Sequence, residues 1–163
     1  MRCIGRFVQF VCVLLLSGCG FHLQGVTHLP AAFKVTYIDA ADRYTEFHQA
    51  LSQQLKSAGA QVVSQQARSN AVIEIVNDET SQRVLSISAA NIPTEYEISY
   101  KIKYRVRLGA QEVVPLQSLV LMRSYSFTES AALAKEREQE IIRSALAKDL
   151  AGLVMRRLAV LTQ

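Results

Sequence analysis

The stretch Glu95–Leu108 reads Glu-Tyr-Glu-Ile-Ser-Tyr-Lys-Ile-Lys-Tyr-Arg-Val-Arg-Leu. Every even-numbered position from Tyr96 to Leu108 carries an aromatic or aliphatic side chain, and every odd-numbered position carries a polar or charged one. Because successive side chains of a β-strand point to opposite faces, this alternation predicts a long strand with one apolar and one polar face. The apolar face should lie on the core. The polar face should be exposed to solvent or contact a polar partner.

Shorter segments rich in β-branched and aromatic residues predict further strands at Lys34–Asp39, Ala60–Val63, Ala71–Val76, Arg83–Ala89 and Pro115–Phe127. Asn77-Asp78-Glu79 has the composition of a turn, so Arg83–Ala89 is expected to fold back on Ala71–Val76 as a hairpin arm. Pro115 lacks a backbone N–H, which indicates the start of a strand at the edge of the sheet.

Two segments have helical periodicity. From Tyr44 to Ala58, apolar side chains recur every three or four residues, and Gly59 follows where a helix end favours a left-handed residue. Ser130–Leu161 contains no proline and a single glycine, which predicts one helix of roughly 45 Å. Its core-facing stripe is expected to be Leu133, Arg137, Ile141, Ile142, Ala145, Leu146, Leu150, Leu153, Val154, Leu158 and Leu161.

The order of these elements predicts the fold class. A strand, a helix, several strands with hairpin-length connections and a final helix are typical of an α+β domain. We expect two helices packed on one face of a mostly antiparallel sheet of four strands or slightly more.

The N-terminus has the features of a bacterial lipoprotein signal. Arg2 and Arg6 precede an apolar stretch too short to span a bilayer, and Leu16-Ser17-Gly18-Cys19 matches the lipobox. We therefore expect residues 1–18 to be removed, Cys19 to receive a diacylglycerol, and residues 19–163 to form a tether and one domain anchored to the membrane. Gly20 stands where an aspartate would favour retention in the inner membrane, so the outer membrane is expected. An ordinary secreted protein with a cysteine near its cleavage point is the alternative.

Composition excludes several classes of protein. The chain has 18 Lys and Arg against 14 Asp and Glu, and Arg2 and Arg6 leave with the signal, so the mature domain is close to neutral. An exported, near-neutral domain is not expected to bind nucleic acid. Cys19 is the only cysteine left after cleavage and is consumed by acylation, which excludes disulfides and thiol catalysis.

The sequence shows no catalytic or metal-binding pattern. His22, His28 and His48 are scattered, and no spacing of His, Cys, Asp and Glu matches a metal set. Glycine-rich phosphate loops are missing as well. We therefore expect a protein that is not an enzyme and uses no cofactor.

One charge pattern is unusual. Lys101, Lys103, Arg105 and Arg107 form a ladder of cations on one face of the long strand, roughly 6.6 Å apart. Like charges in a row cost stability unless anions oppose them. Those anions could be the phosphates of a polyphosphorylated glycolipid, or carboxylates on neighbouring strands or on a partner protein. The sequence leaves both readings open.

Several short motifs resemble the LptE family of lipopolysaccharide-assembly lipoproteins. They are Cys19-Gly20-Phe21-His22-Leu23, Leu29-Pro30, Thr94-Glu95-Tyr96, Arg123-Ser124-Tyr125, Ala132-Leu133-Ala134-Lys135 and Glu138-Gln139-Glu140. Their order and spacing cover most of the chain after the lipobox.

This resemblance implies a function by binding. It implies a 1:1 partner, the LptD β-barrel of the outer membrane, whose lumen such a lipoprotein plugs while lipopolysaccharide is inserted into the outer leaflet. By position, Lys135 and Arg123 match the family's basic residues that contact lipid phosphates. The alternative is a free-standing envelope lipoprotein that carries an apolar substrate for a transporter. Such a carrier should enclose an apolar cavity of ligand size.

Overall fold

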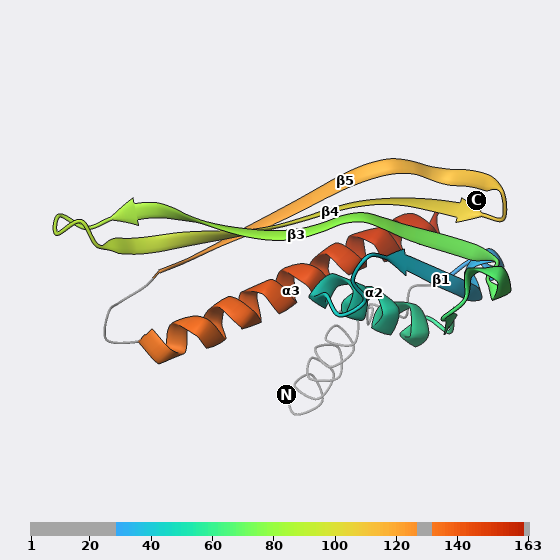
Figure 1. Cartoon of the computed structure of the whole chain (residues 1–163), viewed down its shortest axis with the longest axis horizontal. Helices are drawn as coiled ribbons and strands as arrows, with labels where there is room; N and C mark the ends of the chain where they lie inside the picture. The colour runs from blue at the N-terminus through green and yellow to red at the C-terminus, as the bar shows by residue number, and fades with distance from the viewer. Residues whose placement is uncertain (1–28, 127–131, 162–163) are drawn as a thin grey trace, which may run out of the picture.

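The computed structural model describes residues 29–126 and 132–161, with the side chains of 132–135 excepted (Figure 1). The expected signal segment, 1–18, and Cys19 lie outside these residues. Along the chain the elements are η1 (Ala31–Phe33), β1 (Val35–Ala40), α2 (Glu46–Ser57), β2 (Gln61–Val63), η2 (Gln66–Arg68), β3 (Ala71–Ile87), β4 (Pro93–Leu108), β5 (Gln111–Ser126) and α3 (Ala132–Ala159).

The strands form a five-stranded mixed sheet in the order β2-β1-β3-β4-β5. β1 is parallel to both β2 and β3, whereas β3, β4 and β5 are antiparallel to one another. The prediction of a mostly antiparallel sheet was therefore wrong, because the sheet is mixed, whereas five strands agree with the predicted four or slightly more. The physical reason is that α2 connects β1 to β2 as a crossover, and a crossover returns the chain parallel to the strand that it left.

β3 is one continuous strand, which corrects the prediction of a hairpin between Ala71–Val76 and Arg83–Ala89. The turn-like residues lie within the strand, after a register shift between Ile75 and Asn77. The chain does not reverse there because β4 pairs with β3 along almost its whole length. A long pairing partner of this kind outweighs the weak local preference for a turn.

The predicted alternation of core-facing and polar side chains in β4 is confirmed. Its even-numbered residues from Ile98 to Val106 are at most 2% exposed, and they face the side of the sheet that α2 and α3 cover (Figure 1). Its odd-numbered residues are half-buried on the opposite side. The prediction that two helices pack on one face of the sheet is therefore confirmed.

β5 begins earlier than predicted, at Gln111 rather than at Pro115. Pro115 lies at a register shift opposite the segment between Tyr104 and Val106. A proline is tolerated there because β5 is the outer strand of the described sheet, and the bulge takes Pro115 out of the hydrogen-bonded ladder.

α3 buries Leu146, Ala147, Leu150, Ala151, Val154 and Leu158 between the sheet and α2. Two residues of the predicted stripe do not face the core, because Arg137 is exposed and Ile141 is 68% exposed. The N-terminal half of α3 runs past the end of α2 (Figure 1). Among the described side chains of that half, which has no second helix beside it, Ile142 is buried and Gln139 is partly buried. No helix in the described part of the chain is both long and apolar enough to cross a membrane.

A buried tyrosine connects the sheet to α2. The Tyr100 hydroxyl accepts a hydrogen bond of 3.2 Å from the backbone N–H of Phe47, in the first turn of α2. Burial, followed by the nearby carboxylate of Asp78 on β3, raises the pKa of Tyr100 well above its usual range. The phenol therefore stays protonated and fixes the start of α2 on the sheet.

Gly152 offers a test of the packing between α2 and α3. A methyl group added at Gly152 would lie 3.5 Å from Nη1 of Arg156 and 3.9 Å from Oε1 of Gln54, which are ordinary contacts. Because glycine within a helix is less favourable than alanine by roughly 0.5–1 kcal/mol, we expect Gly152→Ala to stabilise the protein by about that amount. Denaturant unfolding measures the change, and a destabilised variant would show that the two helices are packed more closely there.

Candidate functional site

The side of the sheet opposite the helices is the candidate site, and we call its β3–β5 part the open face. Within the described residues, no helix covers it (Figure 1). Lys101, Lys103, Arg105 and Arg107 all lie on it, at the odd-numbered positions of β4. The cation ladder predicted from the sequence is therefore present as one row of side chains.

Three of the four cations have carboxylate partners on β3. The Nζ of Lys101 lies 3.4 Å from Oε1 of Glu79. Arg105 donates from Nη2 and Nε to the two carboxylate oxygens of Glu74, at 2.6 and 2.8 Å. Arg107 lies 3.9 Å from the same carboxylate. The hydrogen bond from Arg105 holds the pKa of the Glu74 carboxyl below its usual value. The sequence allowed two readings of the ladder. Pairing with carboxylates of a neighbouring strand is the one that accounts for these three cations.

Lys103 differs from the rest of the ladder. Its neighbours across the sheet are Asn77 on β3 and Ser118 on β5, neither of which carries a charge. The described residues provide it with no ion pair or side-chain hydrogen bond. Lys103 is thus an unpaired cation in the middle of a face whose other cations are paired.

The β5 side of the open face is apolar. Val120 is opposite Lys101, and Met122 is opposite Ser99, so both side chains share the face of the ladder. They are 41% and 59% exposed. Leu116, in the bulge opposite Arg105, is 54% exposed. The open face therefore has an ion-paired half toward β3 and an apolar half toward β5.

Arg123 lies on the opposite side of the sheet from the ladder. It pairs in register with Ile98, whose side chain faces the helices, and its Nη2 lies 3.5 Å from Oδ2 of Asp149 on α3. Lys135 belongs to the first turns of α3, but its side chain is not among those described. The six residues predicted from the sequence as a lipid-binding set therefore do not form one cluster.

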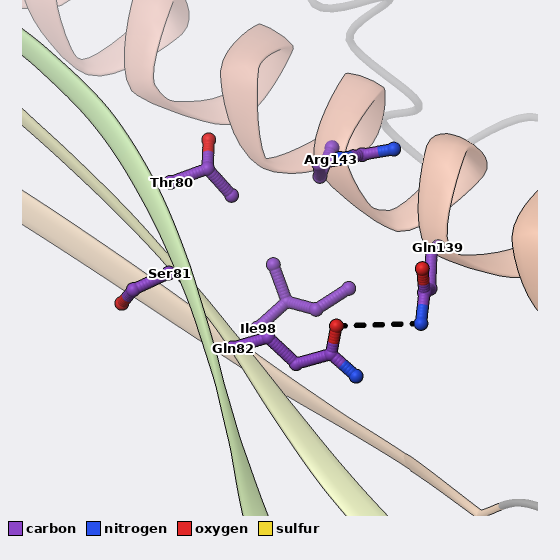
Figure 2. Close-up of a pocket in the computed structure, with 6 residues that line it drawn as sticks. All are labelled: Thr80, Ser81, Gln82, Ile98, Gln139 and Arg143. Carbon is purple, nitrogen blue, oxygen red and sulfur yellow. Dashed lines mark hydrogen bonds between the residues drawn. The ribbon is translucent and has the colours of Figure 1, made fainter.

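A small polar cavity separates α3 from β3 and β4 (Figure 2). Its volume is about 100 Å³, and its lining is Thr80, Ser81, Gln82, Ile98, Gln139 and Arg143. Figure 2 shows Gln139 pointing from α3 toward Gln82, with 3.3 Å between Nε2 and Oε1. Gln139 also donates a hydrogen bond of 2.6 Å to the Tyr125 hydroxyl. This cavity has the size and polarity for a few waters or a small anion and is too small for an acyl chain.

Sequence reasoning missed the cavity and the carboxylates of Glu74 and Glu79. In a strand of strict alternation Glu74 and Glu79 would point to opposite faces, and it is the register shift between Ile75 and Asn77 that brings both to the face of the ladder. For the cavity, the alternation of β4 gave no signal, because its polar lining comes from β3 and α3. Across the described residues, no group of three or more His, Cys, Asp and Glu side chains is placed to hold a metal ion.

His48 provides a pH test of the packing around α2. Burial, followed by the charge of Arg43, lowers the pKa of His48 from its ordinary value of 6.5. Because the folded state then favours neutral imidazole, the unfolded state binds the proton more readily, and stability should fall as the pH drops below about 6.5. We expect the free energy of unfolding to decrease more between pH 7.5 and 5.5 in the wild type than in His48→Gln. Equal decreases in denaturant unfolding would contradict this.

The fold and the open face define a class of protein: a small α+β domain whose helices cover one side of a long-stranded sheet and leave the other side polar. Residues 33–158 match the family described as LptE, lipopolysaccharide-assembly. The chain belongs to this family.

Curated relatives carry the same family name. The chain is 28% identical to "LPS-assembly lipoprotein LptE" of Pectobacterium atrosepticum over 147 residues, covering 90% of this chain and 79% of the relative. It is 26% identical to the protein of that name from Yersinia enterocolitica over 149 residues, covering 91% of this chain and 72% of the relative.

Solved structures show the same fold. Lipoprotein B from Nitrosomonas europaea superposes with a TM-score of 0.72 at 29% identity, covering 88% of this chain and 92% of that one. The rare lipoprotein B from Shewanella oneidensis gives a TM-score of 0.66 at 22% identity, covering 77% and 93% of the two chains. The second similarity bears on the fold alone.

Proposed function

We propose that this protein is an outer-membrane lipoprotein, anchored through Cys19, that plugs the lumen of an LptD-type β-barrel in a 1:1 complex and binds lipopolysaccharide during its insertion. The observation that carries the proposal is the one-sided sheet, which packs its helices on one face and presents a long open face on the other, ion-paired toward β3 and apolar toward β5. Membership of the lipopolysaccharide-assembly family supports it.

A plug needs a polar exterior. The interior of a transmembrane β-barrel is polar and hydrated, so a domain inside it must satisfy its own charges or pair them with the wall. Glu74 and Glu79 already form ion pairs with three cations of the open face, Glu74 being shared by Arg105 and Arg107. The domain can therefore lie against a polar wall without leaving those charges buried and unpaired.

We place the lipopolysaccharide phosphates at Arg123 and Lys135. The ion pair of Arg123 with Asp149 is exposed, with side-chain exposures of 48% and 57%. Exposed pairs contribute little stability, so a phosphate could replace the carboxylate at small cost. On the ladder, a phosphate would have to compete with the carboxylates of Glu74 and Glu79. This makes Lys101, Arg105 and Arg107 the second choice.

The carrier alternative requires an apolar cavity of ligand size. The core beneath the helices is instead filled, because Leu51, Leu150 and Leu158 there are fully buried among packed side chains. The cavity between β3 and α3 is polar and about 100 Å³. The described residues therefore favour a plug over a carrier.

Co-purification tests the proposal. The full-length lipoprotein would carry an affinity tag, be expressed in its native envelope and be purified in mild detergent. We expect a large outer-membrane β-barrel at 1:1, together with lipopolysaccharide that is reduced in the double variant Arg123→Glu, Lys135→Glu. Recovery of the lipoprotein alone, or with inner-membrane transporter components, would contradict the plug and favour the carrier.

A further inference from the structure

β5 leaves one edge of the described sheet open. Its only neighbour is β4, so the backbone groups on its outer side have no strand to bind. Edge strands are usually protected by proline, lysine or a bulge, and Pro115 with its bulge protects the start of β5. The remainder, Gln117–Ser126, contains no proline and no lysine, and its one charged residue, Arg123, lies near its end and pairs with Asp149 of α3. These ten residues therefore form an edge with little protection.

The middle of this edge, residues 119–122, is apolar, as in a strand that is covered, whereas Gln117, Ser118, Ser124 and Ser126 are polar. Val120 and Met122 are exposed on the open face, while Leu119 and Leu121 lie partly buried against the core on the other. A flat apolar edge is a template for pairing with another chain, and left uncovered it promotes aggregation. A stable protein with such an edge is expected to have an occupant for it.

Lys103 indicates the charge of that occupant. Ser118 is its neighbour on β5 and is small, so no long side chain stands between the Lys103 ammonium group and the free edge. A strand added beside β5 would lie roughly 10 Å from β4, since strands are about 4.8 Å apart. The side chain of Lys103 on β4 and that of a glutamate on the added strand, extended toward each other across Ser118, together span that distance. On the β3 side Lys103 meets uncharged Asn77.

We propose that Gln117–Ser126 binds an extended segment of the outer-membrane partner, which pairs with the edge of β5 and places an Asp or Glu side chain against Lys103. The inference rests on the proposed function for the identity of the partner. Pairing with the same stretch of a second copy does not fit, because its open-face residues, Ser118, Val120, Met122, Ser124 and Ser126, include no carboxylate. Apolar residues of the segment would cover Val120 and Met122.

Zero-length cross-linking tests the contact in the native complex. A carbodiimide joins an amine to a carboxylate only when the two touch, so mass spectrometry of the cross-linked, co-purified complex reports the partner of each lysine. We expect Lys103 to be joined to an acidic residue of the barrel protein. Lys101 should be joined to Glu79 of its own chain, which serves as the internal control. Hydrogen exchange should slow in residues 117–126 on complex formation.

Matched variants test the energetic contribution. Lys103→Gln should raise the rate at which the barrel dissociates by about thirtyfold or more, as expected for the loss of one partner of a buried ion pair. Lys101→Gln, whose partner is within the chain, should change it less than twofold. Both changes are on the surface, and unfolding curves would verify that each variant folds.

Four results would overturn the inference. If the barrel co-purifies but Lys103 acquires no barrel cross-link, or residues 117–126 exchange equally fast in the complex, the contact is wrong while the proposed function stands. If Lys103→Gln instead loses bound lipopolysaccharide, Lys103 binds a phosphate and not a carboxylate. If no barrel co-purifies, the proposed function fails, and the inference about its partner fails with it.

Discussion

The Cys19→Ala variant is expected to lose almost all affinity for membranes. A single myristoyl chain binds a bilayer with a constant of roughly 10⁴ M⁻¹, and each further buried methylene adds about 0.8 kcal/mol. The proposed lipid on Cys19 has at least two chains, so its loss should lower the affinity by more than about four orders of magnitude. Flotation of the purified proteins with phospholipid vesicles measures this directly, without the barrel.

The same pair of proteins separates anchoring from recognition. Intact mass should show the lipid on the wild type and a bare chain for the variant exported with another signal. Co-purification with the barrel should persist in Cys19→Ala if the folded domain carries recognition. Flotation of both proteins to the same extent, or a wild-type mass without lipid, would refute the proposed anchor at Cys19.

Tyr100→Ala is expected to destabilise the fold by about 4 kcal/mol, within the range for removing a buried aromatic ring. Tyr100 is 1% exposed at the centre of β4, and its hydroxyl accepts a hydrogen bond from the backbone N–H of Phe47 at the start of α2. Truncation therefore opens a cavity and leaves this buried N–H without its partner. Denaturant unfolding of the non-acylated protein measures the loss.

Tyr100→Phe divides that effect into packing and hydrogen bonding. It keeps the ring and removes the hydroxyl, so we expect a loss of about 1–3 kcal/mol from the unsatisfied N–H alone. Ile141→Ala is the matched control on a 68% exposed residue and should change stability by less than about 0.5 kcal/mol. Equal effects of Tyr100→Ala and Tyr100→Phe would show that the ring contributes nothing to packing.

Local patterns determined a large part of the fold. The alternation of Glu95–Leu108 fixed which side of β4 is buried, because the period of a strand ties sequence position to sheet face. Helical spacing likewise found α2 and α3, and the left-handed residue at the end of α2 is Gly59, with a φ of +86°. These features depend on neighbours in the chain, so one sequence suffices to read them.

Only the tertiary structure decided what lies beside each strand. Asn77–Glu79 reads as a turn in isolation, and it is extended because β4 pairs with it. The order of the strands brought Glu74 to Arg105 and Glu79 to Lys101. It left Lys103 between uncharged neighbours. Arg123 lies on the opposite side of the sheet. Pairing between strands depends on the register of residues far apart in the chain. The sequence therefore determined the row of cations, but the fold decided which of them has no ion pair within the described residues.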